Sequence, residues 1–320
     1  MNSANTKRVD PELLAFLETV PTIAFSDALL GRIRAVPLSW PGGDTRCNPV
    51  QTAAITITGT RGEPDVTVRL SRPQQCPGPL PCILHLHGGG FVSGSAAASE
   101  AKCRQLAFEL NCLVVSVDYR LAPETRFPGA IEDCFAALTW LHAEAEGLQV
   151  DPARVGVMGE SAGGGLAAAL ALLTRDRGGP ALAFQHLIYP MLDDRTCTRV
   201  GRNPLAGRFI WTLHNNHYGW SSLLGEAPGG AGVSPYAAPA RAPDLSGLPP
   251  AFISTGDLDL FLEEDMAYAQ RLSRSGVPVE LHVYPGCFHG FDLAPAAEIA
   301  ARSRTDSLKA LAGALNSGPP

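Results

Sequence analysis

The 320-residue sequence has no cluster of basic residues, and its formal net charge is -6. A mildly acidic chain without a basic patch is a poor candidate for binding nucleic acid or an anionic membrane. Long hydrophobic runs are also missing, because the longest, residues 166–173, is far too short to cross a bilayer. The N-terminal segment has no hydrophobic stretch of the kind found in a signal peptide. We therefore predict a cytoplasmic protein without stable membrane association that acts on small molecules.

The cysteines lack the spacing of a metal site. The sequence has 8 of them, scattered along the chain without a Cys-x-x-Cys pair. Cys82, Cys112 and Cys134 lie in apolar segments, where a free cysteine packs like a small hydrophobic residue. We expect buried thiols, no metal and no cofactor. A disulfide between Cys76 and Cys82 is left open.

Apolar, strand-like segments alternate with helix-like segments along most of the chain. Residues 54–58 and 66–70 alternate between apolar and polar side chains, which is typical of a hairpin. Further strands are expected at 81–89, 112–119, 153–159, 182–190, 249–259 and 277–286. The pattern predicts an α/β fold, in which a mostly parallel sheet is covered by helices on both faces.

One interval interrupts this alternation. Residues 191–248 are rich in Arg, Gly, Pro and aromatic side chains, and an insertion of this length is uncommon without a function. Together with helix-like residues 10–36, it predicts a lid over one end of the sheet. The expected division is N-terminal cap helices at 1–48, the first part of the core at 49–190, a cap insertion at 191–248 and the second part of the core at 249–320.

The segment Gly159-Glu160-Ser161-Ala162-Gly163 lies between an apolar strand and an Ala/Gly-rich helix. Gly-x-Ser-x-Gly in this position is typical of a nucleophile elbow, in which a strained turn lifts the serine hydroxyl clear of the sheet. The two glycines allow the strand and the helix to approach closely. The amide of Ala162, at the helix N-terminus, would face a developing oxyanion. The alternative is that Ser161 only caps the helix, but its context favours a nucleophile.

A serine nucleophile needs a base, and the base needs an orienting acid. His289 lies in a loop between a strand and the last helix, where catalytic groups of α/β folds lie, and is the predicted base. The other histidines after Ser161 are expected in strands or in the lid: His186, His282, His214 and His217. The acid is Asp257 or Asp259, since both follow a strand and their spacing does not separate them.

Four motifs together resemble the hormone-sensitive-lipase-like esterases, in their bacterial branch. They are His87-Gly88-Gly89-Gly90, Asp118-Tyr119-Arg120-Leu121-Ala122-Pro123-Glu124, Gly159-Glu160-Ser161-Ala162-Gly163 and His289-Gly290-Phe291. The resemblance implies an α/β-hydrolase fold with an eight-stranded sheet, and a helical cap built from the N-terminus and a mid-chain insertion. It also implies hydrolysis of carboxylic esters with short or medium acyl chains.

The resemblance assigns a role to each matching residue. Ser161 would be the nucleophile and His289 the base. The family's acid motif, Asp-Pro-Leu-x-Asp-Glu, aligns with residues 259–264, which selects Asp259 over Asp257 although Leu260 replaces the proline. The segment that begins at Asp118 would support the site structurally. The oxyanion donors by analogy are the amides of Gly89, Gly90 and Ala162.

The substrate pocket is the least constrained part of the prediction. Four aromatic residues either line an apolar pocket or form the core of the lid: Phe91, Phe209, Trp211 and Trp220. The expected partner is a small-molecule ester, and a homodimer through an edge strand or the last helix is a further expectation. The alternatives are a non-catalytic small-molecule receptor on the same fold, or a lactonase or amidase that uses the same triad.

Overall fold

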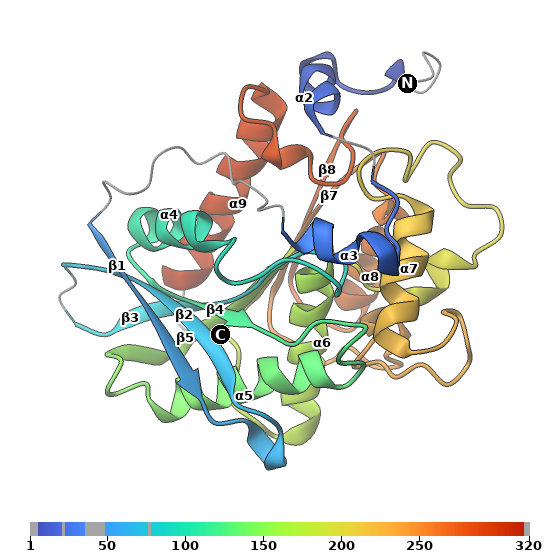
Figure 1. The fold of residues 1–320 in the computed structure, drawn as a ribbon. Helices are drawn as coiled ribbons and strands as arrows, with labels where there is room; N and C mark the ends of the chain where they lie inside the picture. The colour runs from blue at the N-terminus through green and yellow to red at the C-terminus, as the bar shows by residue number, and fades with distance from the viewer. Residues whose placement is uncertain (1–5, 21–22, 36–48, 76–77, 317–320) are drawn as a thin grey trace.

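The computed structural model describes residues 6–20, 23–35, 49–75 and 78–316, and its centre is an eight-stranded sheet (Figure 1). From one edge to the other the strands are β1 (Val50–Ile57), β2 (Val66–Pro73), β4 (Leu113–Asp118), β3 (Leu80–Leu86), β5 (Val150–Glu160), β6 (Gln185–Ile188), β7 (Ala251–Gly256) and β8 (Val279–Tyr284). The hairpin of β1 and β2 is antiparallel and joins β4 antiparallel, whereas the pairs from β4 to β8 are parallel. The predicted mostly parallel sheet is confirmed.

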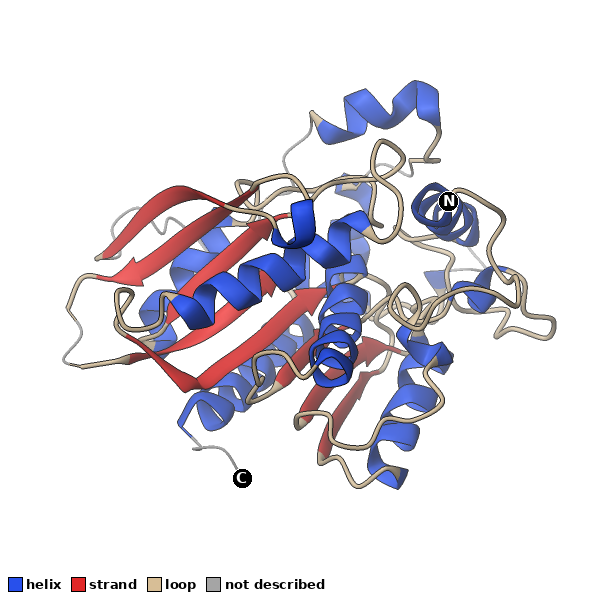
Figure 2. Ribbon diagram, turned by 90° about the horizontal axis from the view of Figure 1, so that it is seen from below, coloured by secondary structure: helices blue, strands red, loops and turns tan. Residues whose placement is uncertain are grey.

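Helices cover both faces of this sheet, as the turned view of Figure 2 shows. On one face lie α4 (Glu100–Leu110) and α9 (Glu298–Asn316), and on the other lie α5 (Gly129–Ala143), α6 (Ala162–Arg177) and α8 (Leu262–Arg274). A strand between two helical layers must be apolar on both sides. Neighbouring residues Ile83 and Leu84 on β3 accordingly face different clusters, with Ile83 against α4 and α9 and Leu84 against α5 and α6.

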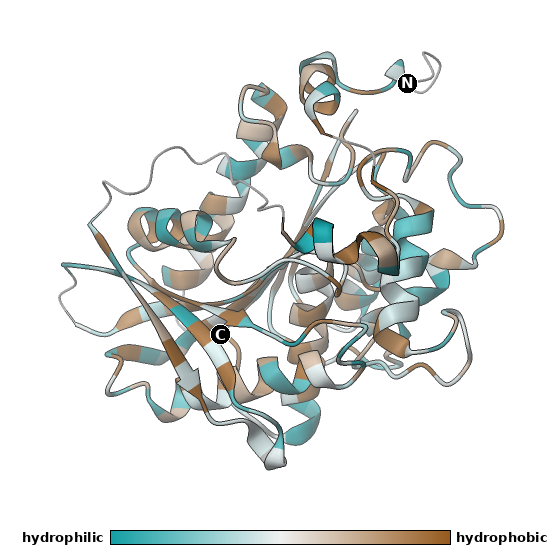
Figure 3. Cartoon of the chain, viewed as in Figure 1, coloured by the Kyte–Doolittle hydropathy of each residue, from teal (hydrophilic) through white to brown (hydrophobic). Residues whose placement is uncertain are grey.

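Hydropathy follows this layering. Figure 3 shows hydrophobic residues along the central strands, while the helices carry both hydrophobic and hydrophilic residues. Burying an apolar side chain contributes about 1.5–3 kcal/mol, so the apolar strands and the helices packed on them both stabilise the core. None of the helices in the described ranges is both long and apolar enough to span a bilayer.

The N-terminal residues and the insertion meet above the sheet. The N-terminus forms η1 (Pro11–Leu13), α2 (Leu14–Thr19) and α3 (Asp27–Arg34), and the insertion forms η4 (Asp194–Cys197), α7 (Leu213–Leu224) and η5 (Pro239–Arg241). In Figure 1, α3 lies beside α7. Several hydrogen bonds join these regions, and among them the Tyr218 hydroxyl donates to Asp27 (2.8 Å) and the Phe25 amide donates to Asn215 (3.0 Å).

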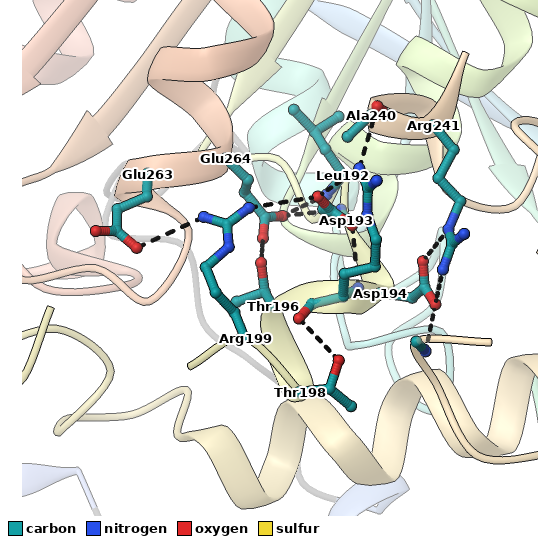
Figure 4. A network of polar contacts seen from close by, with 12 residues as sticks. Leu192, Asp193, Asp194, Thr196, Thr198, Arg199, Ala240, Arg241, Glu263 and Glu264 are labelled. Carbon is teal, nitrogen blue, oxygen red and sulfur yellow. Dashed lines mark hydrogen bonds and ion pairs between the residues drawn. The ribbon is translucent and has the colours of Figure 1, made fainter. Parts of the chain in front are cut away.

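A network of buried carboxylates fixes the start of the insertion to the core (Figure 4). The Glu264 carboxyl group, on α8, accepts hydrogen bonds from the backbone amides of Leu192 (2.7 Å) and Asp193 (3.1 Å) and from the Thr196 hydroxyl. Arg241 binds both oxygens of Asp194, at 2.6 and 2.8 Å. Because much of the insertion is irregular, these carboxylates supply partners that a helix or strand would provide for its own backbone.

The cysteines in the described residues are buried or half-buried free thiols, and Cys82 is one of them. Cys76 lies outside the described residues, so its pairing stays open. Burial raises the pKa of the Cys82 and Cys134 thiols well above their ordinary value. Both therefore remain protonated near neutral pH and are poor nucleophiles.

Candidate active site

Ser161 lies at the turn between β5 and α6, in the predicted elbow. Its backbone has φ 56° and ψ -120°, a conformation that L-residues rarely adopt and that the surrounding fold must hold in place. A Cβ atom at Gly159 would lie 2.2 Å from the carbonyl oxygen of Gly163, and one at Gly163 would lie 2.0 Å from that of Leu86. Glycine is therefore required at both positions, because only a residue without a side chain allows β5, α6 and β3 to approach so closely.

His289 and Asp259 reach Ser161 from two other loops at the same edge of the sheet. The His289 Nε2 atom lies 2.9 Å from the Ser161 Oγ atom, and the His289 Nδ1 atom lies 2.8 Å from the Asp259 carboxylate. Asp259 follows β7, His289 follows β8, and all three side chains are buried. Nδ1–H donates to Asp259, which leaves the Nε2 lone pair to accept the serine hydroxyl proton.

The structure also separates the two candidate acids. Asp257 does not contact His289, and its carboxylate accepts a hydrogen bond from the Gly286 amide at 2.7 Å. Asp259 is fully buried and also accepts a hydrogen bond from the Phe261 amide at 2.9 Å, which fixes its orientation toward the imidazole. Although they are two residues apart, Asp259 therefore contacts His289, whereas Asp257 binds the backbone of the loop that follows β8.

The other histidines that follow Ser161 in the sequence lie away from this arrangement. His186, on β6, is buried and stacks on Phe252 with the ring centroids 4.2 Å apart, as expected for a core residue. His282, on edge strand β8, is half-exposed and bonds to Glu280 at 2.7 Å, so it is a surface residue of the sheet. His214 and His217 lie on α7 in the insertion.

The glycine-rich loop after β3 forms the opposite wall of the site. Gly89 (φ 127°) and Gly90 (φ 62°) both have left-handed backbones, and a Cβ at Gly90 would lie 2.1 Å from the Trp211 ring. The Tyr119 hydroxyl donates to the His87 carbonyl at 2.7 Å and so ties this loop to the segment after β4. Burial lowers the pKa of His87 to about 4, so its ring is neutral near pH 7.

The segment that begins at Asp118 supports the loop, as the sequence predicts. The Asp118 carboxylate accepts a hydrogen bond from the Ala96 amide at 3.0 Å. Arg120 forms an ion pair with the buried carboxylate of Asp133 at 2.7 Å, which ties the segment to α5. These contacts place a rigid support under the glycines.

A cavity of about 270 Å³ opens onto Ser161, His289, Gly89 and Gly90. One part of its wall is apolar and comes from the N-terminal residues, the insertion and the loop after β8: Val20, Ile23, Phe25, Ile210, Trp211 and Leu293. Another part is polar and includes Ser95, Ser99, Lys102 and Glu160. Sequence reasoning missed the polar part, because Lys102 lies within a helix and no motif connects it to the elbow.

Among the four aromatic residues considered for the pocket, only Trp211 lines this cavity. Phe91 and Trp220 are fully buried and pack on each other with ring centroids 5.2 Å apart, so they belong to the core between the glycine loop and α7. Phe209 packs against Phe288, with the ring centroids 5.7 Å apart. Aromatic content alone could not separate these roles, because an apolar ring is equally suited to a pocket wall and to a core.

Within the residues that the structure describes, no group of three or more His, Cys, Asp or Glu side chains is arranged to hold a metal ion. The polar side chain that meets Ser161 is the His289 imidazole, which in turn contacts the Asp259 carboxylate. This set is suited to nucleophilic acyl transfer.

The fold and the Ser161–His289–Asp259 contact define the class of the α/β hydrolases. A sequence model described as the alpha/beta hydrolase fold matches residues 83–293. The chain belongs to this family, in the hormone-sensitive-lipase-like group that its motifs predict.

Named relatives cover almost the whole chain. Esterase LipI of Mycobacterium tuberculosis is 35% identical over 301 residues, which are 91% of this chain and 90% of that protein. Carboxylesterase NlhH of the same species is 35% identical over 323 residues, covering 96% of this chain and 97% of the relative.

Solved structures agree with these relatives. A bacterial heroin esterase superposes with a TM-score of 0.87 and 41% identity, covering 98% of this chain and 99% of the other. Esterase LipW from Mycobacterium marinum superposes with a TM-score of 0.85 and 34% identity, covering 98% of both chains. The similarity therefore extends over almost the whole chain.

Proposed function

We infer that the protein is a carboxylic ester hydrolase, and we propose that it hydrolyses short- to medium-chain esters through an acyl-enzyme on Ser161. The observation that supports this most directly is the pair of contacts made by His289, 2.9 Å to the Ser161 hydroxyl and 2.8 Å to the Asp259 carboxylate. Together these contacts give a weak nucleophile a base, and give the base a fixed orientation.

In the first half of the reaction, Ser161 Oγ attacks the ester carbonyl carbon while His289 Nε2 takes the hydroxyl proton. Asp259 stabilises the imidazolium that forms. The carbonyl oxygen becomes an oxyanion and accepts hydrogen bonds from the backbone amides of Gly89, Gly90 and Ala162. Removing one such donor typically raises the barrier by about 3 kcal/mol.

The tetrahedral intermediate then collapses. The bond between the carbonyl carbon and the alcohol oxygen breaks, and His289 gives its proton to the leaving alkoxide. A water molecule next attacks the acyl-enzyme, with His289 accepting its proton, and the carboxylic acid leaves as Ser161 regains its proton. The reaction needs no redox partner and no co-reactant besides water.

Cavity size supports the chain length in this proposal. A volume of about 270 Å³ and an apolar wall that includes Phe25, Ile210 and Trp211 suit a small ester with an apolar part. In a series of nitrophenyl esters, we expect the highest kcat/KM with short or medium acyl chains. Highest activity on long-chain, micellar substrates would contradict this expectation.

The same wall supports the proposed division into a cap (1–48 and 191–248) and a core (49–190 and 249–320). Phe25 and Trp211 come from the two proposed cap segments, and their rings meet at 5.5 Å beside the cavity. A cytoplasmic location and a homodimer stay predictions.

Substitution of Ser161 by alanine tests the mechanism. We expect ester turnover to fall by more than about 10⁴-fold, because the nucleophile is removed while the fold is retained. Circular dichroism and thermal melting check the fold, and Ser273→Ala, at an exposed position on α8, is the matched control. Undiminished hydrolysis by Ser161→Ala would refute the assignment.

The contact between Ser161 and His289 supports an enzyme over the non-catalytic receptor considered from the sequence. The same triad could attack a lactone or an amide, because both place a carbonyl carbon before a leaving group. Parallel assays on an ester, a lactone and an amide of matched size separate these reactions. The proposal expects the ester to have the highest kcat/KM.

A further inference from the structure

A buried charged network lies directly behind the elbow, in a part of the site that the mechanism above does not use. Lys102, on α4, donates to one oxygen of Glu160. His85 Nε2, on β3, lies 3.1 Å from the other oxygen, and His85 Nδ1 lies 2.9 Å from the Ser116 hydroxyl on β4. Lys102 is 5% exposed and His85 is fully buried.

The position of Glu160 makes its charge important. Glu160 immediately precedes Ser161, and Lys102, Glu160, Ser161 and His289 all line the same cavity. In a site of low dielectric, a charge acts on its neighbours far more strongly than it does in water. An uncompensated carboxylate beside Ser161 would oppose the oxyanion and would favour the imidazolium form of His289, which cannot act as a base.

Glu160 keeps its charge in this environment. Burial by itself raises the pKa of the Glu160 carboxyl, but Lys102 and His85 hold that pKa well below its ordinary value. Lys102 and His85 face the carboxylate directly, and five titratable groups lie within its field: His87, Tyr119, His186, Tyr189 and Asp292. Burying an ion pair carries a desolvation penalty that can exceed the attraction between its charges. Packing of α4 against β5 therefore does not by itself explain why Lys102 and Glu160 are paired there.

We propose that Lys102 is a positioning residue for ester hydrolysis, because its buried ammonium contacts Glu160 and cancels a negative charge next to Ser161. This inference rests on the proposed function and deepens it. The ammonium does not contact the reacting atoms. It acts through Glu160, because it adds a positive charge beside the carboxylate that precedes Ser161, and a nearby positive charge disfavours the protonated form of an imidazole.

Three variants test this role: Lys102→Met, Glu160→Gln and the double variant Lys102→Met/Glu160→Gln. With a short-chain nitrophenyl ester, Lys102→Met should lower kcat about tenfold with little change in KM. A negative charge near an imidazole favours its protonated form, so the acid limb of the kcat/KM profile should move up by about one pH unit. Glu160→Gln should move that limb down or leave it in place. The double variant should restore both kcat and the limb to near wild-type values.

Lys309→Met is the matched control, because it makes the same change at an exposed lysine on α9, and it should leave the profile unchanged. Thermal melting is recorded for each variant. If Lys102→Met does not fold, Lys102→Gln takes its place, since it also removes the charge while keeping a hydrogen-bond donor.

Two results would overturn the inference. One is an unchanged kcat and acid limb in the single Lys102 variant. The other is a double variant as impaired as the single one, because a structural role would not be rescued by removing the partner charge. Neither result bears on the proposed function, which depends on wild-type ester turnover and its loss in Ser161→Ala.

Discussion

The core and the insertion at 191–248 both bury apolar side chains, but the insertion has much less regular secondary structure and relies more on buried carboxyl groups to bind its backbone. In the core, strands such as β3 and the helix α6 bury almost entirely apolar residues on both of their sides. In the insertion, the fully buried carboxylate of Asp194 is paired with Arg241, and Glu264 of the core binds backbone amides of the insertion (Figure 4). Apolar packing is tolerant of shape-preserving changes, whereas a buried charge depends on one partner.

The two regions also contribute different parts of the active site. Ser161, Asp259 and His289 all come from the ends of core strands, while the insertion contributes Ile210 and Trp211 to the cavity wall. Changes at the core edge should therefore act on kcat, and changes in the insertion should act first on stability. The predictions below test each half of this statement, beginning with the largest effect.

The largest effect is expected from Asp259→Asn. Asparagine keeps the shape but no longer stabilises the imidazolium or the Nδ1–H tautomer of His289, so kcat should fall by about 10⁴-fold. The matched change Asp257→Asn, which affects a loop contact instead, should lower kcat by less than about tenfold. Equal losses in the two variants would contradict the assignment of Asp259.

Next comes Arg241→Met, which leaves the fully buried Asp194 without its cation. An unpaired buried charge should lower the free energy of unfolding by about 3–5 kcal/mol, measured by urea denaturation. Arg274→Met, at an exposed position, should change it by less than about 0.5 kcal/mol.

A substitution in the apolar core gives the comparison for Arg241→Met. Leu84→Met preserves the volume of a fully buried side chain and should cost less than about 1.5 kcal/mol. If Arg241→Met proves as mild as Leu84→Met, the charge pair between the two parts of the insertion does not stabilise it more than apolar packing stabilises the core.

The last predicted effect concerns the dependence of stability on pH. Burial raises the pKa of Glu264 well above its ordinary value, so the folded protein keeps a proton that the unfolded chain releases above about pH 4.3. The stability that this carboxyl contributes is therefore complete below that pH and is lost as pH rises through the raised pKa.

Glu264→Gln does not titrate, and this gives the measurement. The stability of the wild type relative to this variant should fall with rising pH, by up to about 1.4 kcal/mol per pH unit, in urea denaturation between pH 4 and pH 8. A difference that grows with pH would show that the charged form of Glu264 is the stabilised one.

Much of the core could be predicted from the sequence, because its strands are apolar runs with turn signals between them. Ser161 and His289 were predictable for a similar reason, since a motif and a loop position mark each of them. Asp259 was separated from Asp257 only by the family resemblance, because both follow the same strand and only the geometry of the turn directs one of them toward His289.

The rest depends on contacts between distant segments. Lys102 and Glu160 are 58 positions apart in the sequence, and no periodicity connects them. Phe91 and Trp220 could not be assigned to core or pocket, because their burial depends on how the glycine loop meets α7. The contacts within the insertion likewise depend on pairs such as Asp194 and Arg241, which local patterns do not reveal.

The central claim is that Ser161 is activated by His289, and a covalent probe tests it most directly. A fluorophosphonate that reacts with activated serines should label the folded protein at one position, which peptide mass mapping should assign to Ser161. His289→Ala should slow this labelling strongly while the protein remains folded. An enzyme that hydrolyses esters but is labelled at another residue, or is labelled equally fast without the imidazole, would contradict the account.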